Sequence, residues 1–207
     1  MPCSPAATST ACNPPASLTC WPACPGCRLP PSQLGSDSQL EASLYRTELS
    51  DAIIFGQGSI PRNVASARIN GAELALKQTW GAWHSQLGLA MIDPRDRDSG
   101  HTLARRARRT LSLDLDRQYE RFGVGANWQA VSSSFDEEAN RNRLAGYGLL
   151  GLRSSWAASD ELKLELKLDN LFDKGYSRAL YSYDNSAYAY REEGRRWLFS
   201  ATWTPAL

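Results

Sequence analysis

The 207-residue sequence has no run of about 18 apolar residues, which excludes a transmembrane helix. It has only two histidines, His84 and His101, and neither lies at a recognisable spacing from a serine or cysteine nucleophile. An excess of charge is also lacking, because the formal net charge is +1 and creates no long-range field for nucleic acid. We therefore expect no enzyme, no cofactor and no nucleic-acid partner. An acid–histidine pair assembled across two loops is the alternative to the first of these expectations.

Cysteine is absent after position 27, since all five cysteines fall in the first 35 residues: Cys3, Cys12, Cys20, Cys24 and Cys27. The same segment holds most of the 11 prolines and a single charge, Arg28, and it has no periodicity that would build a helix or a sheet. Its last three cysteines lack a second pair of zinc ligands. It also lacks the basic and apolar regions of a signal peptide. We expect residues 1–35 to be a disordered leader, such as the product of a misread start on a truncated gene. The sequence predicts no role for its cysteines.

Strict alternation of apolar and charged residues is the dominant pattern after the leader. Between residues 161 and 169 four leucines alternate with five charged residues: Leu162, Leu164, Leu166 and Leu168 against Glu161, Lys163, Glu165, Lys167 and Asp169. A period of two places all leucines on one face of a strand. The segment from Trp197 to Thr204 repeats the pattern. Such a sheet packs on a soluble core or lines a transmembrane barrel with lipid on one side and water on the other.

About eight such strands are predicted in residues 36–207, and the connections between them alternate in length. Those near positions 81, 118 and 158 are short, whereas those near 58, 97, 138 and 182 are long and polar. Outer-membrane barrels have short periplasmic turns and long extracellular loops. Aromatic residues near the strand ends predict interfacial girdles: Trp80, Trp83, Tyr119, Tyr147, Trp156 and Tyr176. The pattern therefore predicts an all-β, antiparallel transmembrane β-barrel segment.

Four motifs, in order along residues 40–204, resemble those of TonB-dependent outer-membrane receptors. They are Y-R-T-E-L-S-D-A-I from Tyr45, A-R-I-N-G-A-E-L from Ala67, R-R-A-R from Arg105 and N-L-F-D-K-G-Y from Asn170. The third motif is similar to the vitamin B12 (cobalamin) receptor branch. The resemblance implies the C-terminal part of an uptake receptor in the outer membrane of a Gram-negative bacterium, carrying cobalamin or otherwise a siderophore.

The resemblance also implies a partial protein, because the family has an N-terminal plug, a TonB-contacting box and a barrel of about 22 strands. We expect that the missing plug would contact TonB, that lipid surrounds the barrel and that the barrel-assembly machinery inserts it. The family favours a terminal aromatic residue, whereas this chain ends Pro205-Ala206-Leu207, so inefficient recognition by that machinery is expected. Transport by this chain alone is not expected.

Two groups of residues are candidates for contacts inside such a barrel. Residues 161–169 would present charges to the lumen, either paired with Arg106, Arg108 or Asp114 or simply solvated. The aspartates between 93 and 98 miss the spacing of a calcium loop and are expected in a solvated loop. The candidates for substrate contact are four tyrosines in a long loop, which offer rigid rings and hydroxyls to a large ligand: Tyr181, Tyr183, Tyr188 and Tyr190.

Three hypotheses follow from the sequence. The first is the C-terminal portion of a TonB-dependent, cobalamin-type receptor. The second is a self-contained, eight-stranded outer-membrane barrel with a structural or adhesive role. The third is a soluble β-sandwich that binds a partner, in which the leucine and tryptophan rows would be packed in a dry core.

Overall fold

The computed structural model describes residues 27–28, 32–33, 37–55, 61–183 and 186–205, and these residues form an all-β structure. Eight long strands make up the main sheet: β3 (Ser38–Phe55), β4 (Pro61–Trp80), β5 (Trp83–Asp96), β6 (Arg109–Tyr119), β7 (Phe122–Val131), β10 (Tyr147–Ala157), β11 (Leu162–Asp169) and β14 (Arg196–Trp203). Each is antiparallel to the next along this series. In the described residues, no helix is both long and apolar enough to cross a membrane.

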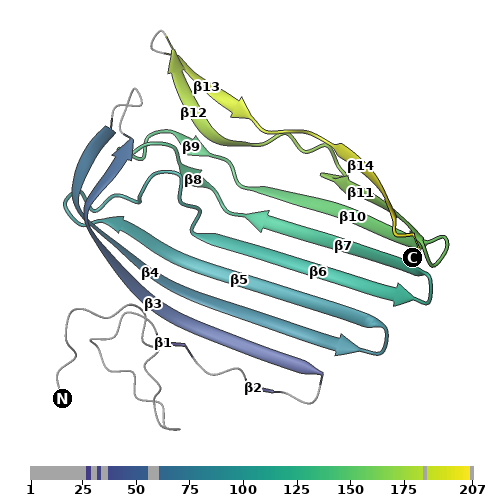
Figure 1. Ribbon diagram of the computed structural model, residues 1–207. Helices are drawn as coiled ribbons and strands as arrows, with labels where there is room; N and C mark the ends of the chain where they lie inside the picture. Colours follow the sequence, from purple (N-terminus) through teal and green to yellow (C-terminus); the bar gives the residue numbers. More distant parts are fainter. Residues whose placement is uncertain (1–26, 29–31, 34–36, 56–60, 184–185, 206–207) are drawn as a thin grey trace.

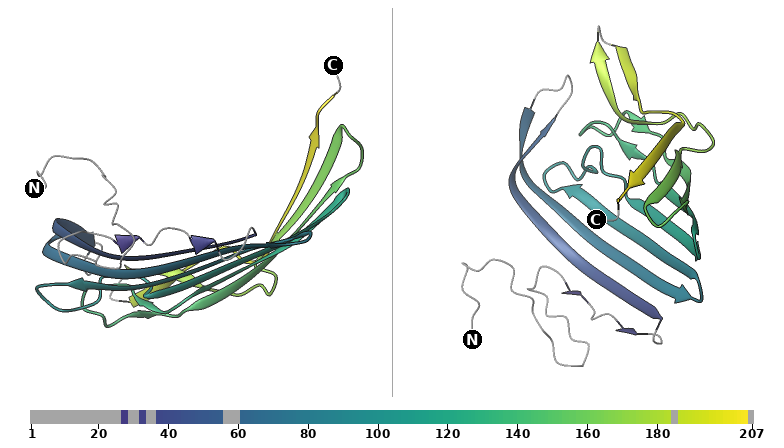
Figure 2. Two further views of the ribbon diagram at one scale, coloured as in Figure 1. Left: turned by 90° about the horizontal axis from the view of Figure 1, so that it is seen from below. Right: turned by 45° about the vertical axis from the view of Figure 1, so that its right-hand side comes forward.

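The main sheet is a single curved layer (Figures 1 and 2). β3 and β14 are the first and last of these eight long strands and, in the described part of the chain, do not pair with each other. An open sheet of this kind differs from a self-contained eight-stranded barrel, which would close on itself. It also differs from a sandwich, since the described residues contain no second layer packed on the sheet.

The predicted alternation is confirmed by the register of the strands. One side of the sheet, here called the apolar face, carries rows of facing side chains such as Leu87, Leu113 and Trp128. The other side, the polar face, carries Gln86, Asp114 and Asn127 in the neighbouring positions. The apolar face is open to its surroundings, as seen for Leu44 (61 % exposed) and Phe199 (65 % exposed). The hypothesis of a dry soluble core is therefore wrong.

Aromatic side chains gather at the end of the sheet where the connections are short. Trp80 and Trp83 stack with their ring centroids 6.5 Å apart, and Arg117 lies over the ring of Trp83 at 5.0 Å. Phe122 and Trp156 stack across β7 and β10 with centroids 5.8 Å apart. Tryptophan and arginine both suit the boundary between hydrocarbon and water, so this cluster has the composition expected of one girdle.

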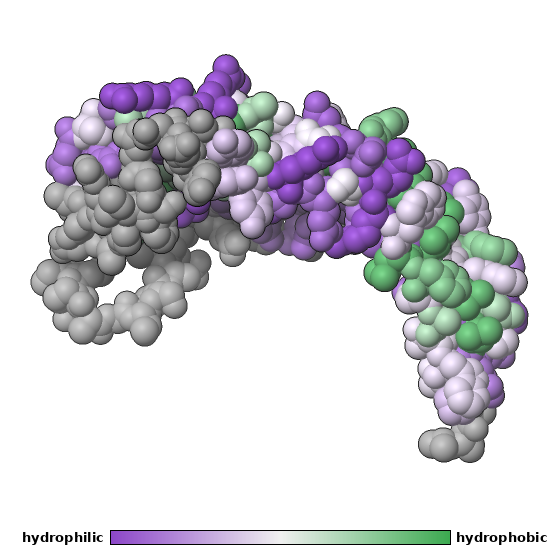
Figure 3. Space-filling model, turned by 90° about the horizontal axis from the view of Figure 1, so that it is seen from above, coloured by the Kyte–Doolittle hydropathy of each residue, from purple (hydrophilic) through white to green (hydrophobic). Residues whose placement is uncertain are grey.

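The opposite end carries the long connections, with two corrections to the prediction. The connection near position 58 spans only residues 56–60, because β3 and β4 stay paired past the end of β5. The segment near position 182 is not a loop but a hairpin of β12 (Ser177–Tyr183) and β13 (Ser186–Arg191). The connection between β7 and β10 also contains two short strands, β8 (Ser134–Phe135) and β9 (Arg143–Leu144). Hydrophilic residues dominate this end of the molecule (Figure 3).

Most of the predicted leader, including Cys3, Cys12, Cys20 and Cys24, lies outside the described residues. Two short pieces of it are described, β1 (Cys27–Arg28) and β2 (Ser32–Gln33), and both pair with the outer edge of β3. This pairing differs from the expectation that the leader builds no sheet. It is explained by β3 itself, since an edge strand presents unpaired backbone groups that any neighbouring segment can bond.

Candidate ligand-binding site

A charged clamp crosses the middle of the polar face. Arg153 on β10 forms a bidentate contact with Asp116 on β6, with its Nε 2.8 Å from Oδ1 and its Nη2 2.5 Å from Oδ2. Its Nη1 donates to Asp114 at 3.1 Å. β7 runs between these two strands, and the residue under the clamp is Gly125, where an added Cβ would lie 2.7 Å from Arg153 Nε. The missing side chain of Gly125 is therefore what allows the ion pair to span three strands.

Further ion pairs continue the polar face toward the C-terminal strands. Lys163 pairs with Glu165 at 2.6 Å, Lys167 with Asp169 at 3.2 Å, and Arg196 with Asp169 at 3.0 Å. The predicted row of charges is thus real, but its predicted partners are not those in the structure. Asp114 pairs with Arg153, and Arg108 pairs with Asp93 at the far end of the sheet. Arg153 itself was missed, although its alternation with Gly151 and Ser155 could have revealed it.

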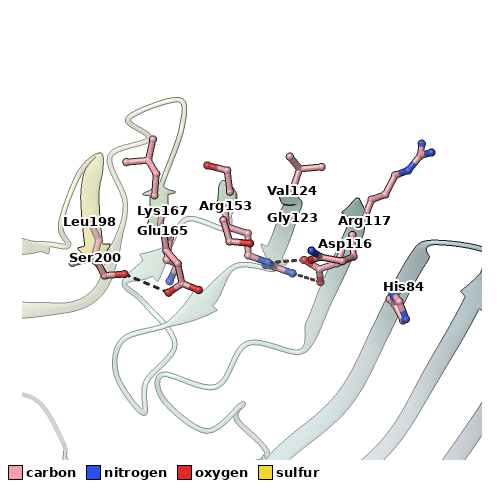
Figure 4. A pocket seen from close by; sticks show the side chains of 14 residues that line it. His84, Asp116, Arg117, Gly123, Val124, Arg153, Glu165, Lys167, Leu198 and Ser200 are labelled. Carbon is pink, nitrogen blue, oxygen red and sulfur yellow. Dashed lines mark hydrogen bonds and ion pairs between the residues drawn. The ribbon is translucent and has the colours of Figure 1, made fainter. Parts of the chain in front are cut away.

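A hollow of about 510 Å³ opens on this charged wall. Figure 4 shows Asp116, Arg153 and Glu165 pointing to the same side of the sheet, whereas Val124 points to the other. Ser200 donates to Glu165 at 3.3 Å on its C-terminal side. The wall offers cations, carboxylates and hydroxyls to a ligand, so it can hold a polar partner by hydrogen bonds.

The second part of the site is the hairpin of β12 and β13, which projects beyond the end of the sheet with the long connections (Figure 1). Tyr181 and Tyr188 are paired directly across it and stack with centroids 5.4 Å apart. Tyr190 meets Tyr181 edge to face at 5.9 Å and is 66 % exposed. Three of the four candidate tyrosines therefore form one exposed aromatic cluster. The side chain of Tyr183 lies outside the described residues, and its backbone pairs with Ser186.

Hydrogen bonds fasten the base of this hairpin to the neighbouring connections. Asp136 Oδ1 accepts a bond from the Leu180 backbone N–H at 2.9 Å and another from Arg105 Nε at 2.9 Å. Arg105 in turn donates to the Leu180 carbonyl at 3.3 Å. Asn140 binds both the N–H and the carbonyl of Thr102, at 2.9 and 2.8 Å. These contacts join residues up to 75 positions apart and were missed, because no local pattern marks them.

Two of the aromatic residues predicted for the girdles, Tyr147 and Tyr176, lie on the polar side of the sheet instead. Tyr147 lies in register with Val131 on the polar face, and its ring contacts Tyr176 at 4.3 Å between centroids. Arg178 lies over the Tyr176 ring at 5.7 Å. Their assignment to the girdle was wrong, because closeness to a strand end does not reveal which face a side chain takes. They extend the aromatic surface between the hairpin and the charged wall.

The aspartates between 93 and 98 do not converge on one point. Asp96, only 4 % exposed, accepts bonds from the Asp98 backbone N–H at 2.9 Å and from Ser99 Oγ at 2.5 Å. Burial raises its pKa, but the bonds from Ser99 and from backbone N–H groups outweigh this and hold the pKa below its usual value. Asp93 faces Arg95 at 2.9 Å. Within the described residues, no group of three or more histidine, cysteine, aspartate or glutamate side chains could hold a metal.

Comparison with known proteins gives one consistent match. The family model "TonB dependent receptor-like, beta-barrel" matches residues 32–171. The vitamin B12 transporter BtuB of Vibrio vulnificus (strain YJ016) is 29 % identical over 164 residues, which are 77 % of this chain and 26 % of the relative. The chain thus spans about a quarter of the length of that curated relative.

Solved structures share the fold. The ferric yersiniabactin uptake receptor FyuA from Yersinia pestis matches with a TM-score of 0.68 and 19 % identity, over 81 % of this chain and 27 % of that chain. The copper transporter OprC matches with a TM-score of 0.67 and 23 % identity, over 82 % of this chain and 29 % of that chain. At these identities the structural likeness concerns the fold.

Proposed function

Since the chain belongs to the family of TonB dependent receptor-like β-barrels, we propose that it forms part of the wall and mouth of an uptake receptor for a large, scarce nutrient. Its place is the outer membrane of a Gram-negative bacterium. The apolar face meets lipid, the polar face lines the lumen, and the hairpin of β12 and β13 lies on the cell exterior, as expected for the longer connections.

The observation that carries the proposal is the exposed tyrosine cluster above a charged, hollowed wall. Stacked rings of Tyr181 and Tyr188 offer a flat surface of fixed geometry to a large planar or chelated ligand. The polar contacts of Asp136 hold the base of the hairpin, so that the ligand meets a preorganised surface. Nothing in this arrangement calls for bond making, and we infer a receptor that binds and passes its cargo unchanged.

We propose cobalamin as the cargo, with a ferric siderophore as the alternative. Support for cobalamin comes from the likeness to a vitamin B12 transporter, which is 29 % identical over 77 % of this chain. We propose TonB as the energy-transducing partner of the complete receptor, through a plug like that of the family, and the barrel-assembly machinery as the inserting partner.

Direct binding tests the cargo. The chain, folded in detergent micelles, is titrated with cyanocobalamin and separately with a ferric catecholate chelate. We expect cyanocobalamin to bind and each of Tyr181→Ala and Tyr188→Ala to weaken binding about 3- to 10-fold, the loss of one aromatic contact. Tyr119→Ala, an exposed tyrosine at the opposite end, is the control and should leave binding unchanged. Binding of the ferric chelate alone would replace cobalamin by a siderophore, and binding of neither would refute the site.

The chain alone should transport nothing, because the described strands form an open sheet and unpaired edge groups cost several kcal/mol each in lipid. Growth of a cobalamin-requiring strain that expresses only this chain as its outer-membrane receptor would contradict this expectation.

A further inference from the structure

Five arginines gather where the apolar face meets the long connections. Arg46 follows Leu44 by two positions on β3, so it points to the same side of the sheet, and Arg109 lies opposite Met91. The remaining three belong to adjacent strands and the connection before β6: Arg68, Arg95 and Arg108. This group, here called the arginine row, borders the lipid-facing surface at the end of the sheet with the long connections.

The arginine row carries more positive charge than its acidic partners neutralise. Glu48 is shared by Arg46 at 2.7 Å and Arg68 at 3.3 Å. Asp93 is shared by Arg95 at 2.9 Å and Arg108 at 3.2 Å. Arg109 has no acidic partner in the described part of the chain. Five arginines against two carboxylates leave a charge of +3 beside hydrocarbon, which an anion of the membrane surface would neutralise.

An apolar hollow of about 290 Å³ lies at the β6 end of the arginine row, where Arg109 is the member of the row that lines it. It opens on the lipid-facing side between β5, β6 and β7, and its lining includes Leu89, Met91, Leu111 and Ala130. Arg109 and Ser132 are part of the same lining and supply its polar border. Met91 is 56 % exposed there. A cation and a hydroxyl at the rim of an apolar trough match an amphiphile with an anionic head and a hydrocarbon tail.

We propose that the arginine row and this hollow form a binding site for a phosphorylated membrane lipid of the outer leaflet. The phosphate would bind Arg46, Arg108 and Arg109, whose guanidinium groups suit phosphate oxygens, and an acyl chain would lie over Met91. The inference rests on the outer-membrane location of the chain and is independent of which cargo it carries. Glu48 and Asp93 compete with the phosphate for the same arginines and so tune its affinity.

Native mass spectrometry tests the site on the full chain folded in detergent micelles. The probe is phosphatidic acid, a phosphomonoester lipid, compared with diacylglycerol, which has the same acyl chains and no phosphate. We expect phosphatidic acid to be retained in preference to diacylglycerol. Each of the single substitutions Arg46→Gln, Arg108→Gln and Arg109→Gln should lower the retention of phosphatidic acid about fivefold. The triple variant Arg46→Gln/Arg108→Gln/Arg109→Gln should lower it about 100-fold.

Two further variants make the outcome decisive. Arg117→Gln removes an arginine on the same face at the opposite end of the sheet, so it should leave retention unchanged. Asp93→Asn frees two arginines and should raise retention, an effect opposite in sign to any loss of folding. Equal losses in the Arg117→Gln and triple variants, no gain in Asp93→Asn, or equal retention of diacylglycerol would each overturn the proposal. Displacement of the lipid by an equal concentration of inorganic phosphate would assign the arginines to a free anion instead, and would also overturn it.

Discussion

Substituting Gly125 by alanine should break the charged clamp on the polar face while leaving the backbone of the sheet intact. An added Cβ would lie 2.7 Å from Arg153 Nε and closer still to Asp116 Oδ1, so one or both of these flexible side chains must move away. The pair is partly exposed, with 32 % of the Arg153 side chain and 45 % of the Asp116 side chain accessible. Losing a bidentate, partly solvated pair costs about 1–2 kcal/mol. Replacing glycine in a strand returns about 0.5–1 kcal/mol of chain entropy.

Gly148→Ala is the matched control, because it changes a glycine on the apolar face of β10. A Cβ there would meet Trp128 at 3.6 Å, an ordinary contact. We expect this variant to be about 0.5–1 kcal/mol more stable than the parent. The two variants should then differ by about 1–2 kcal/mol, the contribution of the clamp. In an Arg153→Met background the difference should vanish.

Urea unfolding in detergent micelles, followed by tryptophan fluorescence, measures these free energies. The role assigned to Gly125 is wrong if the two alanine variants unfold at the same urea concentration in the parent chain. It is equally wrong if their difference persists after Arg153 has been replaced.

Three other perturbations test the fold and the hairpin of β12 and β13. Gly71→Ala should destabilise the chain by about 1–3 kcal/mol in the same urea assay, because the added Cβ would overlap the Tyr45 ring. The second substitution Tyr45→Ala should restore the stability, and absence of this rescue would contradict the contact. Asp136→Ala should speed hydrogen exchange of the Leu180 amide about 10-fold, because the amide loses its bond of 2.9 Å to Asp136 Oδ1. The Lys167 amide in the main sheet is the reference and should exchange at an unchanged rate. In bilayers, the fluorescence of a chain whose only tryptophan is Trp128 should be quenched best by lipids with bromine deep in the acyl chains. The fluorescence of a chain that keeps only Trp80 should be quenched best by bromine near the headgroups. The reverse order would contradict the assignment of the apolar face to lipid.

The strands were predictable from the sequence because their information is local. Alternation at period two assigns Leu162 and Lys163 to opposite faces without knowledge of any partner strand, and the structure confirms this assignment. Motif resemblance supplied the family, since four short segments occur in the family's order. The short turns near positions 81 and 158 followed from the interruptions of the same pattern. The turn predicted near position 118 lies instead at residues 120–121, because β6 continues to Tyr119.

The geometry of the mouth could not be predicted in the same way. Tyr181 and Tyr188 were identified as candidates by composition, but their stacking depends on a hairpin register that the loop sequence does not reveal. The bonds of Asp136 to Arg105 and Leu180 join three separate connections. Arg153 was missed because its partners lie 37 and 39 residues away, and Tyr147 was misplaced because an aromatic residue suits either face near a strand end.

The register of β11 with β10 and β14 decides which of its side chains meet lipid and which meet water. If β11 slipped by one residue, Lys163 and Lys167 would turn toward acyl chains and the leucines toward water. At mid-bilayer depth the two lysines alone would cost up to about 4–8 kcal/mol. The bilayer therefore disfavours the slipped register at equilibrium, and the hydrocarbon beside the sheet acts as a check on strand alignment.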